Sequence, residues 1–289
     1  MVDNKEPPHS SGILYVLTVI FRHRPRELAL TGAVFLIALA VYRIQPSAPV
    51  AASTTAVERG GLVYISEGCI HCHSQYVPPN TADVLMWGPV EGLDELHDES
   101  PPLIGNRRQG PDLTQVGARR SALWLKMHLH NPREVSGSSI MPSYAFLFRD
   151  ERGNDLVAYL GNLHGPATQQ HIADGHQWHL PAEALATATL ADGPRLYNRY
   201  CATCHNANGR TRLKWQSEFM ESPAILYSGA MQIGGSTTLR AARIDHLAQI
   251  IKFGIPNSDM AGHEYLPDRD IASLSSWLAK NTVQPVHKQ

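Results

Sequence analysis

Residues 69–73 read CIHCH and residues 201–205 read CATCH. Both stretches follow the pattern C-x-x-C-H, which is typical of covalent haem attachment. Two thiols about one helical turn apart can reach the two vinyl groups of a porphyrin. The histidine that follows then lies under the ring, where its imidazole can bind the iron. The sequence therefore predicts two covalently bound haem c groups, attached and ligated by Cys69, Cys72, His73, Cys201, Cys204 and His205.

These four cysteines are the only ones among the 289 residues, so none remains for a disulfide or a lone nucleophile. Paired cysteines also occur in zinc sites and in redox dithiols. A structural zinc site needs four ligands that converge, often from two such pairs, whereas each pair here begins its own repeated unit. A thioredoxin-like dithiol belongs to a βαβ context, which the sequence does not show. Haem attachment is favoured over both.

The surroundings of the two motifs repeat. A glycine and a tyrosine four residues apart precede each motif, and this spacing places them on one face of a helix. Each unit ends in a helix-like stretch that contains an aromatic residue. The pairs are Gly60 with Tyr64 and Gly193 with Tyr197, and the closing stretches are 155–163 and 270–280. The repeat predicts a mainly α protein with two class I cytochrome c domains, each with an opening helix that crosses a closing helix.

The sixth iron ligand decides the chemistry, because His/Met ligation saturates the iron and suits electron transfer. Met141 and Met260 lie in loops before the closing helices and are the expected distal ligands. In the first unit Met86 and Met127 compete with Met141, and Met127 falls in a helix-like stretch. In the second unit the competitors of Met260 are Met220, Met231 and His263. The iron ligands are therefore expected to be His73 and Met141, and His205 and Met260.

Residues 110–113, GPDL, lie between the first motif and Met141. A proline there can stiffen the loop and present a carbonyl to the ring N–H of His73, which would fix the tautomer of that ligand. The alternative is an ordinary turn. Arginines flank this stretch, and one or two of them can pair with haem propionates.

The N-terminal part contains the apolar segment 28–44, with Arg43 as its one charge, after a basic cluster at 22–26. A membrane span needs about 20 apolar residues, with roughly 17 as the lower limit. The segment is expected to be a transmembrane anchor with the N-terminus in the cytoplasm. A buried core helix and a signal peptide cleaved within 48–53 are the alternatives.

The expected organisation follows from these features. Residues 1–56 hold the anchor and a linker, 57–165 the first cytochrome c domain, 166–188 a second linker, and 189–289 the second domain with a polar tail. The formal net charge is −1. A nucleic-acid partner is not expected, because it would require a strongly basic face.

Three stretches carry a family resemblance: GLVYISEGCIHCHSQYVPP at 61–79, RRQGPDLTQVGARRSALWLKMHLHNPREV at 107–135, and MPSYAF at 141–146. Residues 28 to about 163 resemble the monohaem cytochrome c subunit of cbb-type haem–copper cytochrome c oxidases. The resemblance implies Cys69, Cys72 and His73 for haem attachment and proximal ligation, and Met141 as the distal ligand. The second unit, with DGPRLYNRYCATCH at 192–205, is similar to a generic class I cytochrome c module.

The expected function is that of a dihaem electron-transfer subunit, not an enzyme by itself, in a respiratory haem–copper oxidase of the bacterial inner membrane. The haem domains would lie in the periplasm. A soluble cytochrome c or cupredoxin would donate electrons, which would pass to a membrane-embedded haem–copper catalytic subunit. The alternatives are a cytochrome c subunit of a nitric oxide reductase, a dihaem peroxidase-like enzyme with an open iron, and a free membrane-tethered shuttle.

Overall fold

The computed structural model describes residues 30, 32–38, 55–79, 81, 83–90, 101–165, 173, 175–205, 214–224, 226 and 237–281. The chain divides into two compact units, Met1–Ser53 and Thr54–Gln289. The described parts of both units are mainly helical, as expected.

The prediction of a transmembrane helix at 28–44 is corrected by the structure. Within that segment, residues 30 and 32–38 are described and are helical and exposed, and the rest of the segment and its basic flank lie outside the described residues. Across the described parts of the chain, no helix combines the length and the apolar character needed to cross a membrane.

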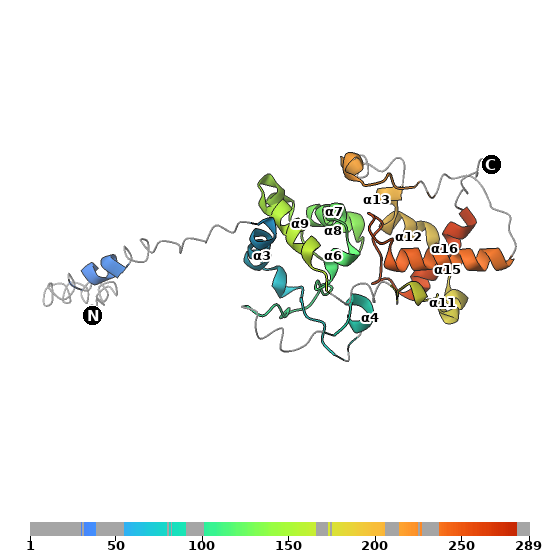
Figure 1. Ribbon diagram of the computed structural model, residues 1–289, viewed down its shortest axis with the longest axis horizontal. Coiled ribbons are helices and arrows are strands. Elements are labelled where there is room, and N and C mark those ends of the chain that lie inside the picture. Colours follow the sequence, from blue (N-terminus) through green and yellow to red (C-terminus); the bar gives the residue numbers. More distant parts are fainter. Residues whose placement is uncertain are drawn as a thin grey trace, which may run out of the picture. The chain divides into compact units, whose positions relative to one another are not determined.

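In the unit Thr54–Gln289, the first helix is α3 (Ala56–Ser66). Thr55 and Glu58 cap it reciprocally, because the side chain of each accepts a hydrogen bond from the backbone N–H of the other. This arrangement satisfies two N–H groups that a helix start leaves unpaired. Helix α3 packs on α9 (Arg152–Asn162) (Figure 1). The two backbones meet closely at Gly60, where an added Cβ would lie 2.0 Å from the carbonyl oxygen of Asp155.

Shorter elements connect α3 to α9. They are η1 (Cys69–His71), α4 (Asp83–Trp87), α6 (Val116–Arg119), α7 (Ala122–His130), α8 (Pro132–Val135) and η2 (Ala145–Arg149). Ser121 caps α7 by accepting from the backbone N–H of Trp124. The described residues 55–165, here called the first lobe, enclose a core that includes Tyr64, Leu125, Leu147 and Leu156.

The described residues from 173 to 281 form a second lobe. It contains α11 (Ala182–Thr187), α12 (Gly193–Tyr200), α13 (Ala202–His205), η3 (Gln216–Glu218), α15 (Thr237–Phe253) and α16 (Asp268–Asn281). Helix α12 crosses α16 at Gly193, where an added Cβ would lie 2.2 Å from Cβ of Trp277. The expected crossing of opening and closing helices is therefore confirmed in both lobes, α3 on α9 and α12 on α16.

Candidate metal centres

The first C-x-x-C-H motif forms a tight turn at the end of α3. The backbone N–H groups of Cys72 and His73 both donate to the carbonyl of Cys69, over 3.2 and 3.0 Å. This closes one turn and places both thiols on the same side of it. Neither cysteine forms a disulfide. The backbone thus brings the two cysteines within one turn of each other, as attachment to a porphyrin requires.

A backbone carbonyl fixes the imidazole of His73. Its Nδ1 lies 2.9 Å from the carbonyl oxygen of Pro111 and donates to it, which leaves Nε2 as the ligating atom. The predicted contact of this proline loop with His73 is confirmed. Burial lowers the pKa of His73 even though the bond to Pro111 and nearby Asp112 oppose that effect, so the ring is neutral and suited to a metal.

Buried Asp112 holds the proline loop in place. Its carboxylate accepts hydrogen bonds from Ser74 Oγ and from the backbone N–H groups of Tyr76 and Thr114, each 2.8 Å long. The loop also approaches the ring very closely, because a Cβ added at Gly110 would lie 2.3 Å from Cε1 of His73. The position of the imidazole therefore depends on a loop that begins 37 residues beyond it in the chain.

The second motif has the same arrangement. His205 donates from Nδ1 to the carbonyl of Ala224, over 2.7 Å, and the N–H groups of Cys204 and His205 donate to the carbonyl of Cys201. The sequence analysis missed the role of Ala224. A signal was present, since Pro223 directly precedes Ala224 between the second motif and Met260, although in the first motif the proline itself, Pro111, supplies the carbonyl.

The first thiol of each motif is not of the reactive kind. Burial raises the pKa of Cys69 to about 11 and that of Cys201 to about 12. Redox dithiols show the opposite shift, because their attacking cysteine must ionise near neutral pH. Within the described parts of the chain, no group of three or more His, Cys, Asp or Glu side chains is placed to hold a metal ion. The raised pKa values favour haem attachment over a redox dithiol.

Met141 lies beside the core that the first motif borders. Its side chain packs against the same buried cluster as Cys69 and Ile70. Its loop is tied to α7, because Tyr144 N–H donates to the carbonyl of Leu129 and Ser143 Oγ to that of His130. By contrast Met127 is fully buried in α7 and fills a separate apolar cluster. These positions support Met141, and its role as the distal ligand stays a prediction.

Met260 lies in a tight loop between α15 and α16. An isolated bridge pairs Gly254 with Ala261, and the N–H of Ile255 donates to the carbonyl of Met260 over 2.9 Å. Among its competitors, Met220 is 61% exposed and Met231 lies outside the described residues. His263 is buried, and its Nδ1 lies 3.1 Å from the hydroxyl of Tyr265. The role of Met260 as the distal ligand also stays a prediction.

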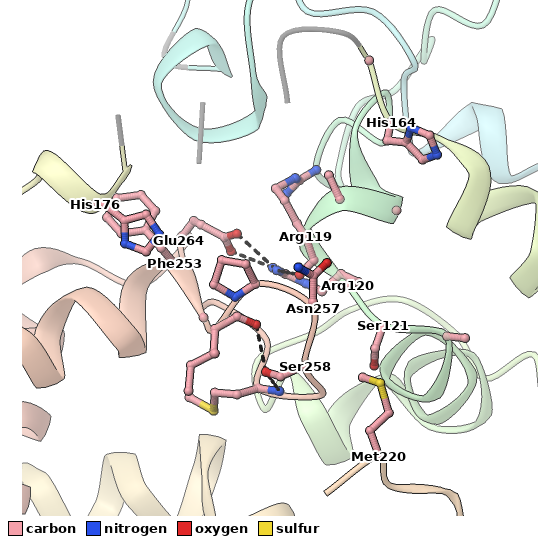
Figure 2. Close-up of a pocket in the computed structure, with 18 residues that line it drawn as sticks. Arg119, Arg120, Ser121, His164, His176, Met220, Phe253, Asn257, Ser258 and Glu264 are labelled. Carbon is pink, nitrogen blue, oxygen red and sulfur yellow. Dashed lines mark hydrogen bonds and ion pairs between the residues drawn. The ribbon is translucent and has the colours of Figure 1, made fainter. Parts of the chain in front are cut away.

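A cavity of about 580 Å³ lies beside this loop (Figure 2). The first lobe lines it with residues 117–122 and 164–165, and the second lobe lines it mainly with residues 253–258, Met260 and Glu264. Figure 2 shows Glu264 directed at Arg120, with Arg119 beside them. No residue of either C-x-x-C-H motif is in this lining.

The residues at both motifs fit haem c. Each motif offers two thiols for thioether bonds and an imidazole whose Nε2 is left for the iron. Nε of Arg119 is buried and has no hydrogen-bond partner in the described structure, and a propionate is a carboxylate that can accept from it. When bound, haem c supplies an iron that takes up and releases one electron.

Two comparisons bear on the identity of the chain. Residues 24–164 match the family model described as "Cytochrome C oxidase, mono-heme subunit/FixO", and residues 188–278 match the one described as "Cytochrome C oxidase, cbb3-type, subunit III". A comparison with curated proteins finds no match. The resemblance inferred from the sequence is confirmed, and the second segment is similar to a subunit of the same type of oxidase. The matches support a cytochrome c electron-transfer subunit of a cbb3 oxidase, with covalently bound haem c.

Proposed function

We propose that this chain, whose two segments resemble two subunits of cbb3-type oxidases, binds two haem c groups and relays electrons from a soluble donor to a haem–copper catalytic subunit. The observation that carries the proposal is the equivalent geometry of the two motifs. In each, a histidine that follows two cysteines donates Nδ1 to a loop carbonyl, that of Pro111 or Ala224, and keeps Nε2 for iron.

The proposed chemistry is one-electron transfer. Met141 and Met260 would serve as distal ligands opposite His73 and His205, and irons held in this way would have no open position for oxygen, peroxide or nitrite. At each motif a loop carbonyl holds the imidazole, which favours a small structural change between the two redox states. The protein therefore acts by holding its two sites in place, and the catalytic subunit reduces oxygen.

The proposed donor is a soluble cytochrome c or cupredoxin that reduces the second lobe. Electrons then pass to the first lobe, which is similar to the mono-heme subunit, and on to the catalytic subunit. The proposed location of both lobes is the periplasmic side of the bacterial inner membrane. Since both matched models describe cytochrome c oxidase subunits, they favour this assignment over a subunit of a nitric oxide reductase.

Haem content tests the proposal. Protein produced with its haem-attachment machinery and extracted with acid–acetone is expected to keep two haems per chain. Replacing Cys69 and Cys72 by Ala, or Cys201 and Cys204 by Ala, should each remove one of the two. A native chain that keeps no haem after extraction would refute the proposal. A chain that keeps one would limit it to a single site.

Carbon monoxide distinguishes the carrier from an enzyme with an open iron. The native reduced protein is expected to bind little CO, because both distal positions are filled. Met141→Ala and Met260→Ala should each open one iron to CO. Met220→Ala is the matched control, because Met220 is largely exposed and should leave CO binding at the native level. Strong CO binding by the native protein would favour a peroxidase-like enzyme instead.

A further inference from the structure

We infer that the two lobes are docked by a buried interface that brings the second haem motif against the first lobe, so that electrons pass between the haem sites within one chain, with Arg120 and Glu264 as positioning residues. This inference rests on the proposed function. It adds the surface through which the two sites communicate and the residues that hold it.

The first support is an ion pair between residues 144 positions apart. The guanidinium of Arg120 donates to both carboxylate oxygens of Glu264, over 3.1 and 2.6 Å (Figure 2). The two side chains are only 6% and 5% exposed. Removing one partner of such a buried pair leaves an unpaired charge, which is strongly unfavourable. The pair therefore favours one way of docking the lobes over others.

The second support is a contact made by the haem motif itself. Thr203 lies between Cys201 and Cys204, and its hydroxyl donates to the carbonyl of Glu134 in α8 over 2.7 Å. A hydrogen bond of this length from a short side chain requires the backbones to lie close together. The second motif thus lies directly on α8 of the first lobe.

The third support is an apolar cluster shared by the lobes. Leu123, Met127 and Val135 of the first lobe surround Trp215 of the second. Trp124 and Cys204 pack against this cluster. Cys204, an attachment cysteine of the second site, therefore borders the same cluster as Trp124 of the first lobe.

Trp124 links this cluster to the first site. Its side chain also packs against the first-lobe core that Cys69 and Met141 border. The guanidinium of Arg120 lies 4.9 Å above its ring, so the buried ion pair and the tryptophan are in one assembly. A continuous packed path therefore runs from Cys204 through Trp124 to the surroundings of Cys69.

The step carried by this path is simple. His205 and His73 would each hold one haem, and these would supply one-electron chemistry: the haem at His205 would be oxidised by one electron and the haem at His73 reduced by the same electron. No bond forms or breaks and no proton needs to move. Since the docked lobes hold both sites in one chain, the rate of this step should not depend on protein concentration.

Flash photoreduction of the full-length holoprotein with less than one electron per chain tests the inference. The absorbance change that follows redistribution between the two haems is expected to be independent of dilution. Glu264→Gln should slow it by about tenfold or more, because the unpaired Arg120 reduces the docked population. Haem content and both midpoint potentials should stay at native values. Glu218→Gln is the matched control, because its pair with Lys126 also joins the lobes but is exposed, and it should change little.

A rescue variant covers the case in which Glu264→Gln does not fold. Arg120→Met combined with Glu264→Leu replaces the pair by apolar side chains and is expected to keep the native rate, since buried pairs can be replaced in this way. A redistribution rate that falls on dilution, or one that Glu264→Gln leaves unchanged, would overturn the inference. If both haems are attached but never exchange electrons within the chain, this inference is refuted while the binding of two haems still stands. Missing haems would refute the proposed function.

Discussion

The two proximal histidines are held by the same kind of bond, a ring N–H donated to a backbone carbonyl. A carbonyl acceptor fixes the tautomer and raises the basicity of Nε2, and it adds no charge beside the iron. At His73 the loop that supplies this carbonyl leaves no space between its backbone and the ring. The identity of one small residue therefore controls the orientation of a ligand.

Gly110→Ala should displace the imidazole of His73. The new Cβ would lie 2.3 Å from Cε1 and 2.6 Å from Nδ1, so the ring or the loop must move. Overpacking of this kind costs about 1–3 kcal/mol. We expect a lower free energy of unfolding and a shifted midpoint potential for the first haem only, measured by urea titration and redox potentiometry.

The control for this substitution is Gly161→Ala in α9, where an added Cβ meets no heavy atom within 4 Å. Alanine is the better helix former by about 1 kcal/mol, so this variant should be neutral or slightly more stable. Native stability and potential in Gly110→Ala would contradict the close approach of the loop.

Buried His263 should make stability depend on pH. Burial lowers its pKa to about 4, with smaller contributions from Arg120 and His205. An unfolded histidine titrates near 6.5, so the folded state binds fewer protons between these values. The stabilising effect is complete above pH 6.5 and is lost as the pH falls toward 4. Between pH 7 and pH 5 its share of the loss is about 2 kcal/mol.

His263→Gln should remove this share, because a glutamine amide does not titrate. The free energy of unfolding, measured in urea at pH 7 and pH 5, is expected to fall less in the variant than in the native protein. An equal fall in both proteins would show that His263 is not held neutral in the folded state.

At the scale of helices, each lobe depends on a crossing of two helices that only a glycine permits. Gly60→Ala should destabilise the first lobe by about 3 kcal/mol, because its Cβ would meet the backbone carbonyl of Asp155 at 2.0 Å and the helices must separate. Thermal unfolding measures the effect. The next residue provides the control, since Gly61→Ala meets only the ring of Tyr159, at 3.3 Å, and should cost much less. Similar losses in both variants would contradict the crossing geometry.

Several of these elements were predictable because local patterns determine them. The closing helices were expected at 155–163 and 270–280 and are observed at Arg152–Asn162 and Asp268–Asn281. The boundaries differ by up to three residues, because helix ends depend on capping more than on apolar spacing. The contact between Pro111 and His73 was also predictable, since a proline between a motif and its expected ligand can stiffen the loop and present a carbonyl to the ring.

Other features were not predictable from local sequence. The segment 28–44 has the apolar character and the basic flank of a membrane anchor, whereas among the described residues the structure contains no helix able to span a membrane. Arg120 follows another arginine, and such pairs on a polar stretch are usually solvated. Its partner Glu264 is 144 residues away, so only tertiary structure shows that the two charges are buried together.

On the scale of the whole unit Thr54–Gln289, the two lobes share buried structure that neither would keep alone. The apolar cluster around Trp215 and the pair of Arg120 with Glu264 both cross from one lobe to the other. Domains joined only by a linker unfold independently, whereas a shared buried interface couples their unfolding. We therefore expect one calorimetric transition for the native holoprotein, with equal calorimetric and van't Hoff enthalpies.

Glu264→Gln should uncouple the two lobes. Breaking a buried ion pair by removing one partner costs about 3–5 kcal/mol, because it leaves an unpaired buried charge. The single transition is expected to split into two, with haem absorbance reporting each lobe. Glu218→Gln should keep one transition, because the Lys126 pair that it breaks is exposed and contributes little. Two transitions already present in the native protein would mean that the lobes fold independently, and the interface would then be too weak to hold the haem sites at a fixed separation.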